Sequence, residues 1–252
     1  MTSKINVNEI YGPVVQGEGK RTGVRSSFVR TNACNLKCAW TNSDGTITKC
    51  DTPYTSWFPE QSNMQTADEI VGQLRQYEQN GEINDVIISG GEPMMQGGIE
   101  QLIQQLIEQD KFVTVETNGT IYKELGENHP HLYSISPKLD SATPFHDDKA
   151  AKIHIRNNVL DNSIPRFVDG MNKGHFDAQF KFVYNEPADI EQIEQFRDKY
   201  SVGKDKIWLM PQGDTLELQI ANTQRTMDEV INNGYNMSTR LHILAYSDKR
   251  GV

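Results

Sequence analysis

The chain has 252 residues and a formal net charge of -9 at pH 7. This acidic balance argues against a surface that binds nucleic acid or an anionic membrane. No apolar run approaches the length that spans a membrane, and the first residues lack the apolar core of a signal peptide, so we expect a cytoplasmic protein. The length suffices for a full hydrophobic core. Because no repeat or linker divides the chain, we expect residues 1–252 to form a single domain.

The N-terminal stretch, residues 5–20, alternates in polarity, reaches a turn signal at Gly12-Pro13 and then reads Gln16-Gly17-Glu18-Gly19. Glycines beside a carboxylate let the backbone approach a ligand closely, and Gln with Glu offers donors and acceptors for an amide- or guanidine-like ring edge. The alternative is an ordinary polar turn. Residues 27–31 are predicted to form a short strand that carries Arg30, which could bind a carboxylate or lie at a solvated strand end.

All three cysteines, Cys34, Cys38 and Cys50, lie in one short segment. Thiolates favour zinc and iron–sulfur clusters. A structural zinc site needs four protein ligands, whereas three thiolates on a four-iron cluster leave one iron open for a small molecule. The pattern therefore favours a cluster. Unrelated thiols, or a zinc site completed by a distant His or Asp, remain alternatives.

Strands, polar turns and helices alternate along the rest of the chain. The first helix has a capping box at Thr66 and Glu69, and the last carries apolar residues at helical spacing. Helices are predicted over residues 66–80, 98–110, 188–200 and 215–233. Strands are predicted over residues 85–89, 112–116, 132–135, 179–184, 207–210 and 240–245. Residues 151–156 also resemble a strand, and the remainder of 139–178 is expected to be mainly loop.

This order predicts a parallel sheet with helices outside. About six strand–helix units can be counted, fewer than the eight of a closed barrel, so we expect an α/β fold with an incomplete (β/α) barrel of about six parallel strands. Polar turns that follow parallel strands gather on one face of such a fold. We therefore expect one pocket to be formed by residues 34–50, 90–93, 117–119, 136–138 and 211–213.

Two motifs together resemble the radical S-adenosylmethionine (SAM) superfamily: CNLKC at residues 34–38 and SGGEP at residues 89–93. The usual cysteine motif of that superfamily is CxxxCxxC. A narrower resemblance, to the 7-carboxy-7-deazaguanine synthase family, extends along the whole chain. It is carried by QGEG at 16–19, Arg30, CDT at 50–52, ETNGT at 116–120, SPK at 136–138 and the ending HILAYSDKRGV.

The chain departs from the superfamily motif between the second and third cysteines, where eleven residues replace two. Residues 40–49 look like an inserted loop, with a turn signal at Asp44-Gly45. The roughly fourfold longer loop costs about 1 kcal/mol of closure entropy, which three iron–thiolate bonds should outweigh. Cys50 is kept as the third ligand because Asp51-Thr52 follows it, as in the family pattern.

The resemblance implies three cofactors: a [4Fe–4S] cluster, SAM and Mg²⁺. Cys34, Cys38 and Cys50 would bind the cluster, and the Thr52 hydroxyl would bind Mg²⁺, a cation that prefers oxygen ligands. The residues implied to contact SAM are Gly91, Glu92, Gly119, Ser136, Pro137, Lys138 and Gln212. The residues implied to hold a pterin-like substrate are Val15, Gln16, Gly17, Glu18, Arg30, Thr117, His242 and, through its terminal carboxylate, Val252.

The implied reaction converts 6-carboxy-5,6,7,8-tetrahydropterin to 7-carboxy-7-deazaguanine with loss of ammonia, a step toward 7-deazapurines such as queuosine. A 5′-deoxyadenosyl radical from the cofactor would start it, so no side chain is assigned as the catalyst. The resemblance also implies an electron donor such as a flavodoxin or ferredoxin, and a homodimer. Lys138 could instead be a solvated loop lysine and His242 a core histidine. The histidines read as structural or surface residues are His129, His131, His146, His154 and His175.

Two other functions remain open at this point. A glycyl-radical-enzyme activase would share the cysteine motif and GGEP, although it would not need QGEG, CDT or a buried C-terminus. A zinc-binding interaction module would use the thiols without iron.

Overall fold

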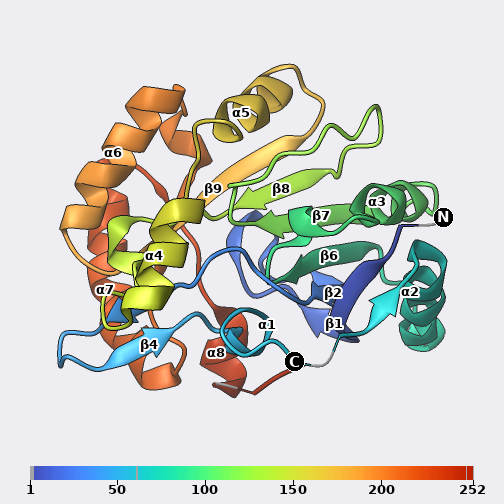
Figure 1. The fold of residues 1–252 in the computed structure, drawn as a ribbon, viewed down its shortest axis with the longest axis horizontal. Coiled ribbons are helices and arrows are strands. Elements are labelled where there is room, and N and C mark those ends of the chain that lie inside the picture. The colour runs from blue at the N-terminus through green and yellow to red at the C-terminus, as the bar shows by residue number, and fades with distance from the viewer. Residues whose placement is uncertain (1–2, 61, 248, 252) are drawn as a thin grey trace.

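The fold is seen in a computed structural model that describes residues 3–60, 62–247 and 249–251. Its main sheet has nine strands in the order β11-β10-β9-β8-β7-β6-β2-β1-β5 (Figure 1). These strands are β1 (Ile5–Val15), β2 (Arg25–Thr31), β5 (Met64–Gln65), β6 (Asp85–Gly90), β7 (Phe112–Thr117), β8 (Leu132–Ile135), β9 (Asp177–Tyr184), β10 (Ile207–Pro211) and β11 (Asn236–Met237). From β2 to β11 all neighbours are parallel, whereas β1 pairs antiparallel with β2 and β5.

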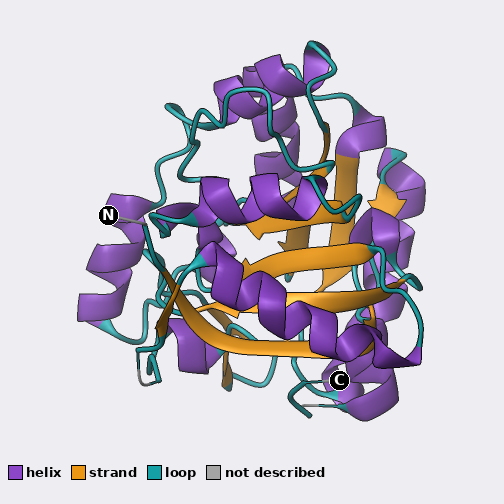
Figure 2. Cartoon of the chain, turned by 90° about the vertical axis from the view of Figure 1, so that its right-hand side faces the viewer, coloured by secondary structure: helices purple, strands orange, loops and turns teal. Residues whose placement is uncertain are grey.

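Helices lie along the outer side of the strands, as Figure 2 shows. In chain order, the helices of the described residues are α1 (Pro53–Ser56), α2 (Ala67–Leu74), α3 (Ile99–Ile107), α4 (Asp148–Asn157), α5 (Ile164–Asn172), α6 (Ala188–Tyr200), α7 (Leu216–Asn233) and α8 (Leu241–Tyr246), of which α1, α4 and α8 lie beside the site instead. The sheet is open, because β5 and β11 are its two ends and do not pair with each other. The prediction of an incomplete barrel with about six parallel strands is therefore confirmed. None of the helices in the described part of the chain combines the length and apolar character needed to cross a membrane.

Side chains alternate between the two faces of the sheet, so that one face forms the core and the other faces the site. Val29, Ile88, Val115 and Tyr133 point into the main hydrophobic core, as does Phe180. The residue after each of these on its own strand points to the opposite face, since side chains alternate along a strand. That opposite face carries the polar residues Arg30, Ser89, Glu116, Ser134 and Lys181. Register aligns several of them, since Arg30 pairs with Ser89 and Glu116 with Ser134. The barrel interior is therefore polar.

Two predicted strands are helices, so those predictions were wrong. Residues 151–156 belong to α4, which begins where the Asp147 carboxylate accepts hydrogen bonds from the backbone N–H groups of Lys149 and Ala150. Residues 240–245 overlap α8. Both segments are short and rich in apolar residues, and periodicity over so few positions does not separate a strand from a helix. α5 forms within a region expected to be mainly loop.

Two smaller differences lie near the site. β1 continues to Val15 past the predicted turn at Gly12-Pro13, with a register irregularity between Tyr11 and Val14. The segment expected to be an inserted loop forms a hairpin of β3 (Ala39–Thr41) and β4 (Ile47–Lys49), turning at Gly45 with a φ of +81°.

Candidate active site

A cavity of about 480 Å³ lies at the carboxyl ends of the parallel strands. Arg30, Gly90, Thr117 and Val183 line it from the ends of β2, β6, β7 and β9. Sites in folds of this kind form at that edge, because the turns that follow the strands meet there. The five segments predicted to share one pocket all contribute to its wall.

The three cysteines line this cavity and surround one small apolar cluster. Leu36, Cys38, Trp40 and Ala142 are buried there, with Cys34 and Cys50 packed against them. Cys34 Sγ accepts a hydrogen bond from the Leu36 backbone N–H at 3.4 Å. Such N–H···S contacts favour a thiolate over a thiol.

The hairpin explains how eleven extra residues are accommodated. Strand pairing sets Ala39 opposite Lys49, and the Cys50 backbone N–H donates to the Cys38 carbonyl at 3.1 Å. The chain therefore runs out into the hairpin after Cys38 and returns at Cys50 to a position beside Cys38. Because the hairpin closes on itself, its length does not separate the second and third cysteines.

Burial disfavours all three thiolates when no positive charge lies between them. It raises the pKa of Cys34 to about 12 and that of Cys50 to about 11, and it raises the pKa of Cys38 well above its ordinary value. Iron ions would supply the missing positive charge. Cluster binding should therefore release protons from these thiols.

The geometry of the thiols fits a cluster better than a single zinc ion. A tetrahedral zinc with Zn–S bonds of about 2.3 Å holds its sulfurs roughly 3.8 Å apart. Among the described residues, three ligand atoms within 4.8 Å of one another are found at Glu18, Asp51 and His242, and the three thiols do not form such a group. Thiolates on different irons of a cluster are held further apart, so this donor set suits a multi-iron cluster.

The glycine turn after β6 crosses the cysteine loop at close range. Gly90 has a φ of +125°, and a Cβ on Gly91 would overlap the Ala33 carbonyl. The Glu92 N–H donates to that same carbonyl at 2.9 Å. Only glycine allows this approach, which presents backbone polar groups to a ligand beside Cys34.

Three of the residues implied to contact SAM do not line the cavity: Glu92, Gly119 and Pro137. The Glu92 carboxylate is fully buried and accepts hydrogen bonds from Met94 N–H, the Thr117 hydroxyl and Asn118 N–H, at 2.7–3.0 Å. It therefore ties the turn after β6 to the turn after β7. Gly119 lies in that second turn, where its φ of +79° favours glycine.

The other residues implied to contact SAM do line the cavity: Gly91, Ser136, Lys138 and Gln212. Lys138 Nζ donates to the Ser136 hydroxyl at 2.7 Å. Gln212 is 1 % exposed, and its amide nitrogen has no hydrogen-bond partner although it is buried. A buried donor without an acceptor is costly, so this amide suits a polar ligand atom.

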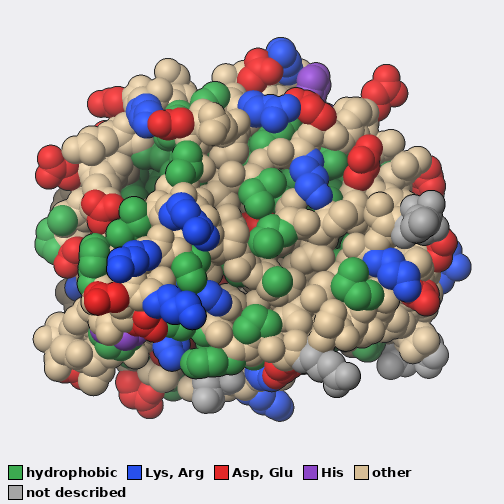
Figure 3. Space-filling model, in the orientation of Figure 1, with side chains coloured by type: hydrophobic (Ala, Val, Ile, Leu, Met, Phe, Trp, Pro, Cys, Tyr) green, Lys and Arg blue, Asp and Glu red, His purple; other side chains and the backbone are tan. Residues whose placement is uncertain are grey.

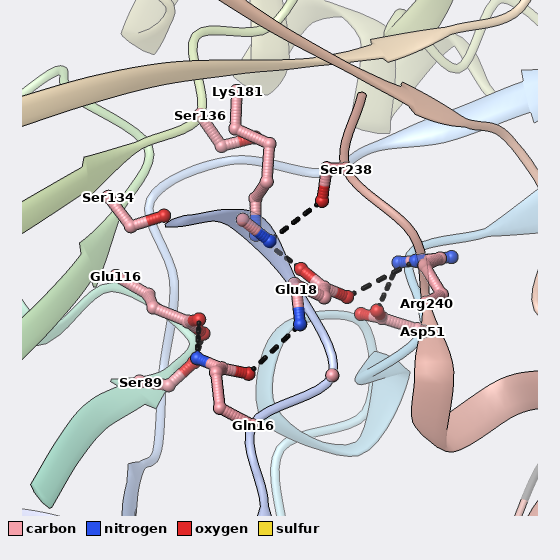
Figure 4. Close-up of polar contacts among 12 residues, drawn as sticks. Gln16, Glu18, Asp51, Ser89, Glu116, Ser134, Ser136, Lys181, Ser238 and Arg240 are labelled. Atoms are coloured by element: carbon pink, nitrogen blue, oxygen red, sulfur yellow. Dashed lines mark hydrogen bonds and ion pairs between the residues drawn. The ribbon is translucent and has the colours of Figure 1, made fainter. Parts of the chain in front are cut away.

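Glu18 is the centre of a charged network, drawn in Figure 4. Lys181 pairs with one carboxylate oxygen, and Arg240 Nε lies 3.2 Å from the other. His242 Nε2 is 3.9 Å from that second oxygen. Burial would raise the pKa of Glu18, but Lys181, Arg240 and His242 together hold it well below its usual range. Glu18 is therefore a buried anion.

A second, smaller network lies beside it. Gln16 Nε2 donates to Glu116 at 3.0 Å, and the Ser89 hydroxyl donates to the other oxygen of Glu116 at 2.7 Å. Gln16 Oε1 accepts from the Glu18 N–H at 3.2 Å. The amide of Gln16 is thus already used to shape the loop, and its role in holding a substrate remains a prediction.

The other described residues on the substrate side border the cavity: Val15, Gly17, Arg30, Thr117 and His242. Arg30 Nε donates to Glu9 at 2.8 Å, and Val15 lies at the rim with 46 % exposure. A Cβ on Gly17 would collide with the His242 ring, so glycine is needed there. Thr117 is held by Glu92. Val252 lies outside the described residues, and residues 249–251 line the cavity.

Thr52 lines the cavity directly after Asp51. It precedes α1, whose cap receives no hydrogen bond from the Thr52 side chain. The Asp51 carboxylate pairs with Arg240. An oxygen-rich wall of this kind suits a hard cation such as Mg²⁺.

Four charged residues that line the site and form its ion pairs and hydrogen bonds were given no role from the sequence: Asp51, Glu116, Lys181 and Arg240. Asp51 and Glu116 lie inside recognised motifs but were given no role. The sequence did offer a signal for Lys181, because this lysine lies between two phenylalanines in β9. In the structure it is only 4 % exposed. Arg240 has no local signal, because its partners are 27, 189 and 222 residues away in the sequence.

Comparison with known proteins agrees with this site. Residues 28–163 match the profile of the Radical SAM superfamily, which covers more than half of the chain. Three clustered thiols in an open α/β barrel are what that superfamily requires, and the chain belongs to it. A [4Fe–4S] cluster and SAM are the cofactors that membership implies.

Curated relatives identify the family within this superfamily. The chain is 33% identical over 239 residues to the 7-carboxy-7-deazaguanine synthase of Rhodopirellula baltica, covering 94% of this chain and 85% of the relative. It is 31% identical over 254 residues to the synthase of Halobacterium salinarum, covering 96% and 90%. The chain is therefore a member of the 7-carboxy-7-deazaguanine synthase family. The expectation of this family is confirmed, and the activase and zinc-module alternatives are not favoured.

Solved structures agree on the fold. The crystal structure of QueE from Escherichia coli superposes with a TM-score of 0.65 at 21% identity, covering 95% of both chains. Streptococcus suis SuiB bound to S-adenosylmethionine gives a TM-score of 0.53 at 17% identity, covering 82% of this chain and 48% of SuiB.

Proposed function

We propose that the protein converts 6-carboxy-5,6,7,8-tetrahydropterin to 7-carboxy-7-deazaguanine, releasing ammonia. One observation carries the proposal: three thiols suited to a cluster and a buried, charge-paired Glu18 line the same cavity of about 480 Å³. The relatives named for this product supply the reaction. When bound, the cluster and SAM would supply the radical chemistry needed to remove a hydrogen atom from carbon 6 of the substrate.

The protein's part in this reaction is to bind and orient. A pterin presents N–H groups along its pyrimidine edge, and the anionic Glu18 would accept hydrogen bonds from them. Arg30 lines the same cavity and would bind the substrate carboxylate. Holding the ring at both ends would fix carbon 6 relative to the cofactor, which lowers the entropic part of the barrier.

We further propose that the Thr52 hydroxyl would help to hold a Mg²⁺ ion in this cavity. Thr52 lines the cavity, and its side chain is not used to cap α1. Such an ion would supply positive charge for a carboxylate of the substrate. At the SAM side, the Gln212 amide and the Gly91 backbone would bind polar groups of the cofactor.

An external electron donor would be needed, and α4 is the surface that we propose for it. This helix covers the cysteine loop, because His154 Nδ1 lies 2.7 Å from the Lys37 carbonyl and Asn157 Nδ2 donates to the Asn35 carbonyl at 2.7 Å. Basic side chains gather over α4 and β4 in Figure 3. On α4 these are the exposed Lys149, Lys152 and Arg156, against one acidic residue, Asp148. An acidic flavodoxin or ferredoxin would suit this surface.

The proposed reaction can be tested with anaerobically reconstituted protein, 6-carboxytetrahydropterin, SAM, Mg²⁺ and dithionite. The expected result is a deazapurine with the mass of 7-carboxy-7-deazaguanine, together with ammonia and 5′-deoxyadenosine. Formation of 5′-deoxyadenosine without a deazapurine would keep the superfamily chemistry and reject this substrate. The homodimer and the substrate contact through the terminal carboxylate of Val252 stay predictions.

A further inference from the structure

β1 carries a further register irregularity, between Val7 and Glu9, which turns Glu9 toward the site. Val7 is buried in the main hydrophobic core. On a regular strand, residues two positions apart point to the same face, so Glu9 would follow Val7 into the core. The irregularity instead pairs Glu9 with Arg30, and the next residue, Ile10, packs against the core. Irregularities of this kind re-aim a side chain, and they are common beside active sites.

Glu9 and Tyr11 together hold the guanidinium of Arg30. Arg30 Nε donates to Glu9 Oε1 at 2.8 Å, and Arg30 Nη2 donates to the Tyr11 hydroxyl at 2.6 Å. Both partners are fixed in turn. The Tyr54 hydroxyl donates to the same oxygen of Glu9 at 3.2 Å, and the Tyr11 ring stacks on Phe28 with 5.2 Å between the ring centroids. The position of Arg30 is therefore set by its neighbours on β1.

These contacts leave one edge of the guanidinium for a ligand. A guanidinium carries five N–H groups in a planar fork and can bind a carboxylate through two parallel hydrogen bonds. Glu9 and Tyr11 take up the edge formed by Nε and Nη2. Within the part of the chain that the structure describes, Nη1 has no hydrogen-bond acceptor. Arg30, Tyr11 and Tyr54 line the cavity, so the edge that contains Nη1 is the one left for a ligand there.

An arginine that is held in this way binds one geometry of ligand in preference to others. A free arginine side chain has many rotamers, and ordering them when a ligand binds lowers the affinity. Because Glu9 and Tyr11 already hold Arg30, that ordering is completed when the chain folds. Glu9 also offsets part of the positive charge of Arg30, so the planar shape of the remaining edge contributes more to selection than the net charge does. A carboxylate has the matching shape.

We propose that Glu9 is a positioning residue which, together with Tyr11, aims the remaining edge of Arg30 at a carboxylate of the ligand. Tyr54 supports Glu9 in this role. The site thereby selects a pterin that carries a carboxylate over a pterin that lacks one. This inference rests on the proposed function, because the pterin class of ligand is taken from it.

Equilibrium dialysis of the reconstituted holoprotein with SAM measures this selection. The two probes are pterin-6-carboxylate and unsubstituted pterin, which are both fully oxidised and do not turn over. We expect the wild type to bind the carboxylate probe more tightly. Glu9→Ala should reduce that preference by about tenfold, because it removes the charge-assisted partner of Arg30, and it should leave binding of unsubstituted pterin unchanged. Tyr11→Phe should reduce the preference less, since it keeps the ring stack and the Glu9 contact.

Glu9→Gln separates position from charge. Its amide oxygen can still accept from Arg30 Nε, so this variant should keep the wild-type preference. Glu78→Ala is the matched control, because Glu78 pairs with Lys111 at side-chain exposures of 27 % and 10 %, close to the 23 % and 13 % of Glu9 and Arg30. It should change neither dissociation constant. Iron content and SAM binding near the wild-type values show that the variants fold.

Three results overturn the inference, and they differ in what else they reject. A wild-type preference that persists in Glu9→Ala rejects the positioning role and leaves the proposed reaction standing. A preference lost equally in Glu9→Gln and Glu9→Ala shows that the charge at residue 9 matters and its geometry does not. A wild type that binds neither probe rejects the pterin substrate, and the role of Glu9 is rejected with it.

Discussion

Arg240 donates to Glu18 across 222 residues of sequence, with its Nε 3.2 Å from Glu18 Oε1. The same guanidinium pairs with Asp51 and donates to the Gly213 carbonyl at 2.6 Å. One side chain, 8 % exposed, thus joins the loop after β1, the end of the cysteine segment and the loop after β10. Because all three segments line the cavity, Arg240 sets the distance between the substrate side and the cofactor side.

Replacement of this residue should therefore affect substrate binding more than cluster binding. Arg240→Lys keeps the charge but lacks the planar fork that makes three contacts. Losing a charge-assisted hydrogen bond costs about 1.5–3 kcal/mol, so we expect the KM for the pterin to rise by roughly 10- to 100-fold while iron content and SAM affinity stay near wild type. Steady-state kinetics and iron analysis measure this.

Arg166→Lys provides the control, since Arg166 is a half-exposed surface residue paired with Glu124. Its KM should equal that of the wild type. An unchanged KM in Arg240→Lys would show that the loops keep their spacing without the guanidinium.

The third cluster ligand is tested by Cys50→Ala, which should leave the protein without a stable [4Fe–4S] cluster. The long turn of the hairpin should be dispensable, because the hydrogen bond from Cys50 N–H to the Cys38 carbonyl closes the base of the hairpin. Replacing residues 42–46 with Asn-Gly, a turn suited to a two-residue hairpin loop, should keep the full iron content. Iron and sulfide analysis decides both. A full cluster in Cys50→Ala would reject this ligand.

The Mg²⁺ role of Thr52 makes a separate prediction. Thr52→Ala should keep the cluster and raise the Mg²⁺ concentration needed for half-maximal activity, whereas Thr52→Ser keeps the hydroxyl and should behave like the wild type. Folding should be little affected, because the Thr52 side chain does not cap α1. A magnesium titration identical in the alanine variant and the wild type would remove the role.

His154 should make the cysteine loop sensitive to acid. Burial lowers its pKa below the ordinary 6.5, aided by Lys138 and opposed by the hydrogen bond to the Lys37 carbonyl and by Asp140. The unfolded chain therefore binds a proton at a higher pH than the folded chain does. Stability should fall as pH drops below about 6.5, down to the folded pKa.

Urea unfolding of the cluster-free protein at pH values of roughly 7.5 and 5.5 measures this loss. His154→Gln cannot take up the proton, so the difference in free energy of unfolding between the two pH values should be smaller in the variant. Equal differences would mean that His154 does not contribute.

The sequence revealed those parts of the site whose residues lie close together along the chain. Cys34, Cys38 and the glycine turn at residues 90–91 sit in short motifs whose chemistry can be read directly, and the turns that follow the strands gather because parallel strands end together. Arg240 could not be found in this way, since its contacts form only after folding. The motif alone did not reveal how Glu92 acts. Its carboxylate accepts hydrogen bonds within the protein, and Gly91 lines the cavity instead.

The fold was predictable where strands and helices were long. α6 matches its predicted residues, 188–200. α4 and α8 were predicted as strands because short apolar runs fit either period. Their helical state depends on tertiary contacts, such as the burial of His154 against the cysteine loop.

The most direct test is electron paramagnetic resonance of the anaerobic, reduced protein with and without SAM. A cluster held by three thiolates has one iron that can take a new ligand, so we expect the iron–sulfur signal to change when SAM is added, in protein that carries about four irons per chain. A signal that SAM leaves unchanged, or protein that holds one zinc and no iron, would contradict the account.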